Sequence, residues 1–117
     1  MLLLASCGGD EPDPAINPKF EHKLSFLDEM RAHAALRPAA KDRVILVGDL
    51  NVAPLEHDVW SHKQMLRVVS HTPVECEKLG LAQKAGNWID AMRVLTPERI
   101  EVAEASLRDA QESLGLR

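Results

Sequence analysis

Aromatic residues and cysteines are scarce in this chain, and long apolar runs are absent. The 117 residues include two phenylalanines, two tryptophans and no tyrosine, so a core has to rely on aliphatic side chains. Neither Cys7 nor Cys76 has a partner at C-x-x-C spacing, which excludes a disulfide framework or a zinc cluster and favours reduced thiols. No segment approaches the roughly 20 apolar residues that cross a bilayer, so we expect a cytoplasmic protein with no membrane partner.

The first residues invite a second interpretation. Residues 4–7 read Leu-Ala-Ser-Cys, which matches the lipidation site of bacterial lipoproteins. A signal peptide needs a positive start and an apolar stretch of about 7–15 residues. Here no Lys or Arg precedes Lys19, and the apolar run ends at Ala5. We therefore predict that Leu2–Leu4 form a strand instead.

The balance of charge is acidic. The net charge is −4 and the pI about 5.7, which is the wrong sign for binding nucleic acid by bulk charge alone. A nuclease that relies on a bound metal ion and a few local lysines remains compatible with this balance. The length leaves room for one domain.

The most informative stretch is residues 43–54, Arg-Val-Ile-Leu-Val-Gly-Asp-Leu-Asn-Val-Ala-Pro. Its β-branched apolar run predicts a strand over 43–48 that is buried on both faces. Open α/β folds place ligands at the carboxyl ends of such strands. Asp49 and Asn51 follow at that end, and in an extended chain their side chains lie on one side, where they can hold a metal-bound water or a phosphate oxygen. The plainer interpretation is a turn, in which Asp and Asn are common.

Two helices are predicted around this strand. Asn17 followed by proline is typical of a helix start, and apolar residues recur at helical spacing over 18–36. Thr72 followed by proline starts a second helix over 73–85. Gly86 then stands where a C-terminal cap belongs.

The five histidines show no metal-binding pattern. None has a histidine four residues away on a predicted helix, and none is flanked by cysteine. We expect all five to be solvated: His22, His33, His57, His62 and His71.

The C-terminal half predicts an ion pair and a third helix. Asp90 and Arg93 are three residues apart, which predicts a structural pair on a helical turn. Residues 66–69 remain open between a helical end and a strand. Residues 98–117 predict a helix with an apolar seam that needs a partner; the seam comprises Ile100, Ala103, Leu107, Ala110 and Leu114.

Gly48-Asp49-Leu50-Asn51 resembles the G-D-[FLM]-N motif of the endonuclease/exonuclease/phosphatase superfamily. Three flanking segments narrow the resemblance to the exodeoxyribonuclease III family. They are residues 9–27, Asp58-Val59-Trp60 and residues 86–93. The resemblance covers about residues 8–97 and rests on the order and spacing of these segments.

The resemblance implies an α/β fold. The expected architecture is a partial two-layer α/β sandwich, a fragment of the superfamily fold, with a C-terminal helix. Residues 1–97 would form the partial exodeoxyribonuclease III-like domain, and residues 98–117 a divergent helix.

The resemblance also implies a DNA-repair nuclease that hydrolyses phosphodiesters in duplex DNA, at abasic sites and 3′ ends, with Mg²⁺ or Mn²⁺. Asp49 would transfer protons and Asn51 would orient the reacting groups, both at the metal, while Lys19, Lys23 and Trp60 would contact DNA. The family also uses a metal-binding glutamate on an early strand, a tyrosine and a Ser-Asp-His segment, and none of these has a counterpart in this sequence. We therefore expect the isolated chain to be inactive or weakly active.

Two alternatives stay open. Another branch of the superfamily acts on phospholipids or inositol phosphates, but residues 10–20 and 58–60 argue against it. A non-catalytic chain is the other alternative, either a truncated remnant or a helix-mediated interaction module that self-associates through residues 98–117.

Overall fold

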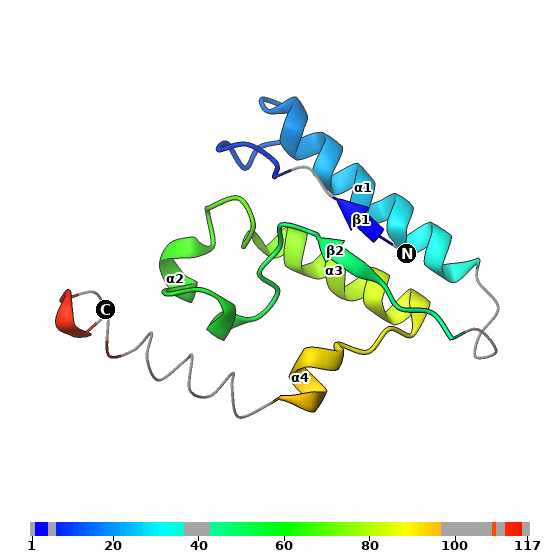
Figure 1. Cartoon of the computed structure of the whole chain (residues 1–117). Coiled ribbons are helices and arrows are strands. Elements are labelled where there is room, and N and C mark those ends of the chain that lie inside the picture. Colours follow the sequence, from blue (N-terminus) through cyan, green and yellow to red (C-terminus); the bar gives the residue numbers. More distant parts are fainter. Residues whose placement is uncertain (1, 5–6, 37–42, 97–108, 110–111, 116–117) are drawn as a thin grey trace.

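The computed structural model describes residues 2–4, 7–36, 43–96, 109 and 112–115. Helices and strands both occur, so the predicted mixed content is confirmed (Figure 1). In chain order the elements are β1 (Leu2–Leu4), α1 (Pro18–Ala35), β2 (Val47–Asp49), the 3₁₀ turn η1 (Glu56–Asp58), α2 (His62–Met65), α3 (Pro73–Gly86) and α4 (Ala91–Leu95). None of the described helices is long and apolar enough to cross a membrane.

The two long helices begin where the sequence predicts. The Asn17 side chain accepts the backbone N–H of Lys19 (3.0 Å), and proline occupies the first turn of α1. Proline likewise follows Thr72 at the start of α3. In both helices the proline does not destabilise the helix, because a backbone N–H in the first turn has no partner within the helix.

The end of α3 differs by one residue from the prediction. Asn87, not Gly86, takes the left-handed conformation after the helix, with φ 53°. Asparagine tolerates this conformation better than most residues. Gly86 is required for a different reason, because a Cβ atom there would collide with the indole of Trp88.

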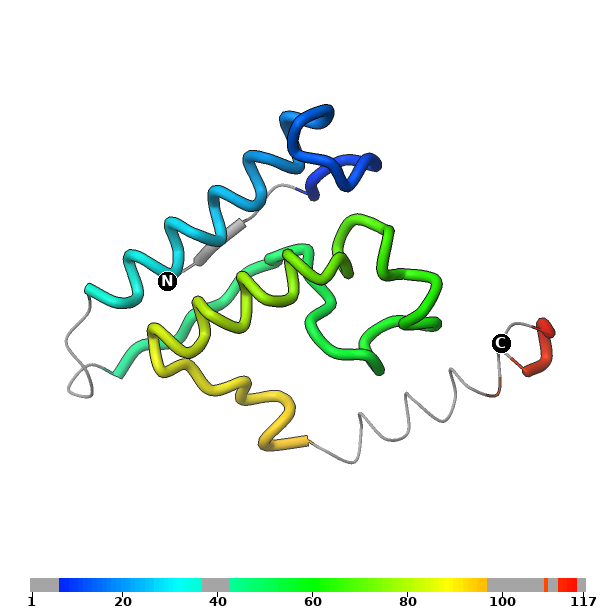
Figure 2. The backbone as a smooth tube through the Cα atoms, turned by 180° about the vertical axis from the view of Figure 1, so that it is seen from behind, coloured from blue at the N-terminus to red at the C-terminus, as the bar shows by residue number. Residues whose placement is uncertain are grey.

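The core lies between α1 and α3, which run side by side (Figure 2). Its buried apolar side chains are few: Phe20, Leu27, Ala34, Val69 and Ala82. The α1 members recur at a spacing of seven, so they lie on one face of that helix. At the surface of the same interface, Lys78 of α3 pairs with Asp28 of α1 (2.6 Å).

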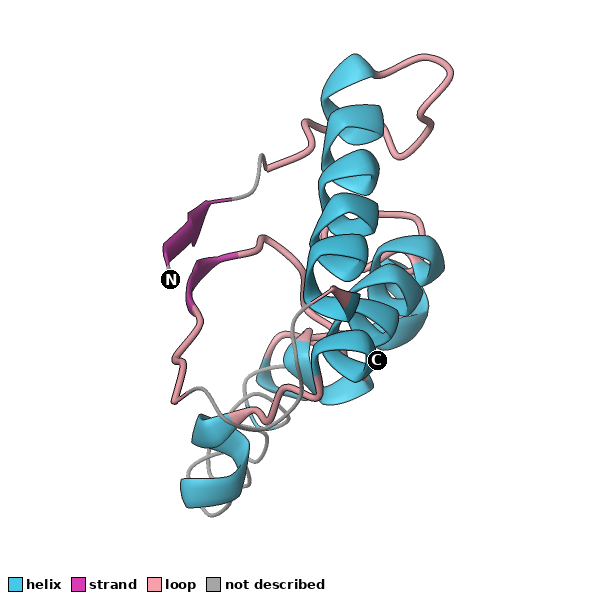
Figure 3. Cartoon of the chain, turned by 90° about the vertical axis from the view of Figure 1, so that its right-hand side faces the viewer, coloured by secondary structure: helices cyan, strands magenta, loops and turns pink. Residues whose placement is uncertain are grey.

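The two strands form a parallel pair, with Leu2 opposite Val47 and Leu4 opposite Asp49. The predicted strand at residues 2–4 is therefore confirmed. The pair lies to one side of the long helices (Figure 3). The described residues form this pair and no larger sheet, so the α/β sandwich is not shown.

The prediction of a buried strand over 43–48 is wrong in two respects. The strand is shorter and lies later, at Val47–Asp49, and its surroundings are exposed: Ile45 is 76% exposed and Val47 52%. An apolar run indicates that burial is favourable, but it does not supply the layers that bury it. Among the described elements β2 has one neighbouring strand, and no helix packs closely on it.

Two further predictions concern residues 66–69 and 98–117. Residues 66–69, left open by the sequence, form turns rather than a helix or a strand. The predicted helix over 98–117 falls almost entirely outside the described residues.

Candidate functional site

We call residues 48–55, which follow or end β2, the motif loop. Asp49 is the last residue of β2, and its Oδ1 accepts the backbone N–H of Asn51 (2.8 Å). Asn51 has φ 52°, so the chain turns here and does not stay extended. The expected alignment of the two side chains along a strand is therefore wrong. The aspartate bonds the backbone two residues on, as Asp commonly does in turns.

Lys23 lies beneath this loop and not at the surface. Its side chain is fully buried. Its Nζ donates to the carbonyl oxygen of Asn51 (2.5 Å), and more weakly to the carbonyl of Cys7 and the hydroxyl of Ser70 (both 3.4 Å). The expectation that Lys23 contacts DNA is corrected, because a buried ammonium is not accessible to a phosphate backbone.

Glu75 neutralises Lys23. The two side chains form an ion pair (2.5 Å) with no exposure on either side. The Glu75 carboxylate also accepts the backbone N–H groups of Ser70 (2.9 Å) and Thr72 (3.2 Å), and the Thr72 hydroxyl (2.6 Å). A buried ion pair is tolerable when further hydrogen bonds satisfy it. Thr72-x-x-Glu75 has capping-box spacing. The sequence therefore indicated that Glu75 caps the start of α3, but it did not indicate its pairing with Lys23.

His71 joins the same group, which corrects the expectation that all histidines are solvated. It is 2% exposed. Its Nδ1 lies 2.6 Å from the carbonyl oxygen of Ala53, and its Nε2 lies 2.8 Å from Nδ1 of His62. Because a carbonyl only accepts, Nδ1 of His71 carries a hydrogen. Nε2 of a neutral His71 then accepts from Nδ1–H of His62.

The motif loop is therefore attached to the rest of the fold at several points. The N–H of Ala53 donates to the carbonyl of Ser70 (2.8 Å), beside the bonds from Lys23 and His71. We call the residues that make or support these bonds the polar cluster: the buried Lys23, His71, Thr72 and Glu75 and the half-buried Ser70. Among the described residues, no buried side-chain nitrogen or oxygen lacks a hydrogen-bond partner.

Cys76 borders the polar cluster. Its Sγ donates weakly to the carbonyl of Ala53 (3.5 Å). Burial raises the pKa of the Cys76 thiol, and the negative charge of Glu75 raises it further. Cys76 is therefore a protonated thiol at neutral pH and a poor nucleophile.

A second ion pair shapes the chain beyond the motif loop. Arg93 of α4 donates from Nη2 to both carboxylate oxygens of Asp58 (2.7 Å each), and the hydrogen bond with Asp58 raises the pKa of Arg93. Nε of Arg93 donates to Asp90 (2.9 Å), so the predicted pair is confirmed. Asp58 also accepts the N–H of Leu55 (2.9 Å), which fixes the turn η1.

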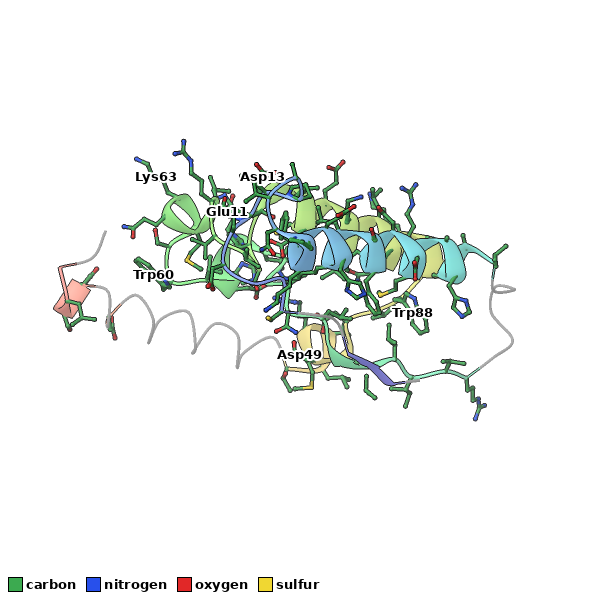
Figure 4. The ribbon with its side chains drawn as sticks, turned by 90° about the horizontal axis from the view of Figure 1, so that it is seen from above. Glu11, Asp13, Asp49, Trp60, Lys63 and Trp88 are labelled. Atoms are coloured by element: carbon green, nitrogen blue, oxygen red, sulfur yellow. The ribbon has the colours of Figure 1, made fainter. Side chains whose placement is uncertain are left out.

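Trp60, which is also expected at DNA, lies apart from Asp49. Figure 4 shows Asp49 beside the strands and Trp60 with Lys63 at the α2 end of the molecule. Trp60 is 36% exposed, and Lys19 is exposed in the first turn of α1. The roles of Lys19 and Trp60 stay predictions.

The described residues do not make a complete magnesium or manganese site. Mg²⁺ prefers six oxygen ligands in octahedral geometry. Asp49 is the one carboxylate within the motif loop, and Asp58 is already bound to Arg93. Over the described part of the chain, no three histidine, cysteine or acidic side chains gather in a way that can hold a metal ion.

Comparison of the chain with profiles of known families, with curated proteins and with solved structures finds no match. Function has to be inferred from the motif loop and the groups around it. The loop presents an exposed carboxylate and, two residues on, an amide. Such a pair can take a proton from water and donate a hydrogen bond to an anionic oxygen.

Proposed function

We propose that this chain carries the catalytic loop of a DNA-repair nuclease that resembles exodeoxyribonuclease III. One observation carries the proposal. The motif loop, which the resemblance already singles out, follows a parallel strand and is held from beneath by Lys23 and His71. A turn that merely connects two elements at the surface does not need two buried polar side chains bonded to its backbone.

In the proposed reaction a water attacks the phosphorus of a DNA phosphodiester, and the bond from phosphorus to the 3′ oxygen of the neighbouring nucleotide breaks. That oxygen leaves as a hydroxyl, with a proton from solvent water. Asp49 takes the proton of the attacking water. The Asn51 amide donates to a phosphate oxygen and orients it. Lys19 contacts the DNA backbone, and Trp60 stacks at an abasic site.

The metal of this class is Mg²⁺ or Mn²⁺, to which Asp49 would contribute one oxygen ligand. The described residues do not supply the remaining ligands. We therefore expect the chain by itself to hydrolyse DNA slowly or not at all. DNA binding is the property that the chain should retain.

The test combines binding with cleavage on duplex DNA carrying one abasic site. Fluorescence anisotropy at low salt should show tighter binding to this duplex than to the intact duplex, and Trp60→Ala should abolish the preference. Asp49→Asn should abolish any cleavage that depends on Mg²⁺ and disappears with EDTA. Asp28→Asn is the matched control, because Asp28 pairs with Lys78 on the helices. A folded chain that shows neither the binding preference nor cleavage would overturn the proposal.

A non-catalytic role is the second candidate, and one observation favours it. Several large apolar side chains near β2 and α4 are more than half exposed: Ile45, Val47, Ile89, Met92, Val94 and Leu95. Exposed apolar groups of this kind favour association with another protein surface. Sedimentation velocity at micromolar concentration tests this role, since a stable dimer without DNA binding would favour an interaction module.

A further inference from the structure

We propose that Lys23 is a positioning residue, whose buried ammonium holds Asn51 in its left-handed conformation and so sets the geometry of the motif loop. This replaces the expected contact between Lys23 and DNA. The contacts around Lys23 place its ammonium at the backbone of Asn51. The meaning of this position for catalysis rests on the proposed function.

The backbone of Asn51 is bonded at both ends. Its N–H donates to Oδ1 of Asp49, and its carbonyl accepts from Nζ of Lys23. A residue other than glycine is uncommon at φ 52°, and asparagine tolerates this conformation better than most residues. The identity of the residue permits the conformation, and the two bonds favour it. The two bonds together orient both peptide units of Asn51. The direction of its side chain from the Cα atom follows from them.

The buried stem of Lys23 reaches the loop through a gap left by a glycine. A Cβ atom on Gly8 would lie 2.9 Å from Cδ of Lys23, closer than packed carbon atoms approach one another. Gly8 also has φ 86°, a conformation that favours glycine. The first loop of the chain is therefore shaped around the Lys23 side chain.

Glu75 is the second short contact of the Lys23 ammonium and also orients it. It neutralises Lys23, and its remaining hydrogen bonds tie it to Ser70 and Thr72. An ion pair that only joined α1 to α3 would require neither burial nor the bond to Asn51, as the exposed pair of Lys78 and Asp28 between the same helices shows. Lys23 differs in that it also makes a short bond to the motif loop, which belongs to neither helix.

The experiment compares Lys23→Met, the double variant Lys23→Met/Glu75→Gln and the control Lys78→Met. The double variant is needed because Lys23→Met alone leaves a buried carboxylate without its counter-ion and is at risk of not folding. Glutamine at 75 keeps an oxygen that accepts the Ser70 and Thr72 amides. Backbone chemical shifts of Asn51 report its left-handed conformation, and amide hydrogen exchange compares the motif loop with α1 and α3.

In the double variant we expect the Asn51 shifts to leave the left-handed range. Exchange at the Asn51 amide should rise by about tenfold or more while the central amides of α1 and α3 stay within about threefold, since a local opening does not require global unfolding. Lys78→Met should change neither. Unchanged Asn51 shifts and exchange in a folded double variant would overturn the proposal.

If the double variant does not fold, a measurement on the unmodified chain tests whether Lys23 contacts the backbone of Asn51. Nuclear Overhauser contacts between the Lys23 ε-methylene and the backbone of Asn51 and Val52 are expected. Their presence supports the proposal and their absence overturns it. Because none of these readouts uses DNA, a chain in which Lys23 orders the loop but which neither binds nor cleaves DNA would refute the proposed function alone.

Discussion

Two regions of the described molecule differ in which side chains they bury. Between α1 and α3 the interior includes charged groups, and each of them is paired, as Lys23 is with Glu75. Around β2 and α4 the large apolar side chains are mostly exposed, as Ile45 just before β2 and Leu95 at the end of α4 are. The region with the polar interior is the better packed, and the region with the apolar sequence is the more open.

This difference shows that hydrophobic composition alone does not decide where a chain is well ordered. Apolar side chains are buried only where a second layer approaches them. The polar cluster makes directional bonds to separate segments, so a few residues can hold several loops in place. The motif loop lies between these two regions, with its backbone fixed by the polar cluster and its strand in the open part.

Removing the charge of Lys23 should have the largest effect. Lys23→Met leaves Glu75 buried and unpaired, which should lower the free energy of unfolding by about 3–5 kcal/mol. Urea denaturation followed by circular dichroism measures this loss. Lys78→Met removes an exposed pair between the same helices and should cost at most about 1 kcal/mol. Equal losses of unfolding free energy in the two variants would mean that the buried ion pair stabilises the fold no more than the exposed one.

The apolar side chains of the two regions should respond differently to truncation. Leu27→Ala removes a fully buried side chain and should cost about 2–5 kcal/mol. Ile45→Ala removes a side chain that is mostly exposed and should stay within about 0.5 kcal/mol of the unmodified chain. The same urea titrations test both. A large loss for Ile45→Ala would show that β2 is buried in solution, by self-association or by a further part of the chain.

Removing the ion pair of Asp58 and Arg93 should lower the free energy of unfolding by a smaller amount. Arg93→Met removes charged hydrogen bonds that are partly open to solvent, which should cost about 1 kcal/mol. The change should be local, because Asp58 still accepts the N–H of Leu55. Amide exchange is the measurement, with faster exchange expected over η1 and α4 and unchanged exchange at the centre of α1. A uniform increase over all helices would contradict this local role.

The smallest effect concerns Cys76. Folding raises the pKa of its thiol above the usual 9.0, so the folded chain holds its proton where the unfolded chain releases it. This contribution to stability is fully present below pH 9.0 and is lost as the pH rises through the raised value. Denaturation at pH 8 and pH 10 should therefore show a smaller loss for Cys76→Ala than for the unmodified chain. The same loss in both would place the thiol in a more solvated environment.

The sequence predicted the two long helices, α1 and α3, well because their signals are local. Asn17 and Thr72, each followed by proline, mark starts that depend on the nearest turn alone. The prediction of a buried strand over 43–48 was wrong because burial is not a local property. It depends on layers that a short window of sequence does not contain. The turn at Asn51 agrees with the plainer interpretation of the motif, whereas the period-2 argument assumed an extended chain.

The candidate site was predicted in part. The motif located Asp49 and Asn51, but nothing in the spacing indicated that Lys23, more than twenty residues earlier, would reach the backbone of Asn51. Lysine on a predicted amphipathic helix is normally solvated, and His71 was likewise assigned to solvent. Long-range pairing of buried polar groups is a property of the fold, and single-sequence patterns carry little information about it.

The parallel pairing of β1 with β2 also constrains how the chain folds. Two parallel neighbours cannot be joined by a tight turn, and here the whole of α1 lies between them. Their contact closes a long loop, whose entropy cost must be met before the strands gain anything from pairing. The contact between α1 and α3 closes a loop of similar length, but it buries Phe20 and Leu27, whereas Val47 of β2 stays half exposed. We therefore expect α1 and α3 to associate first and the strand pair to form late, so that the β2 end of the motif loop is among the last parts of the molecule to reach its final shape.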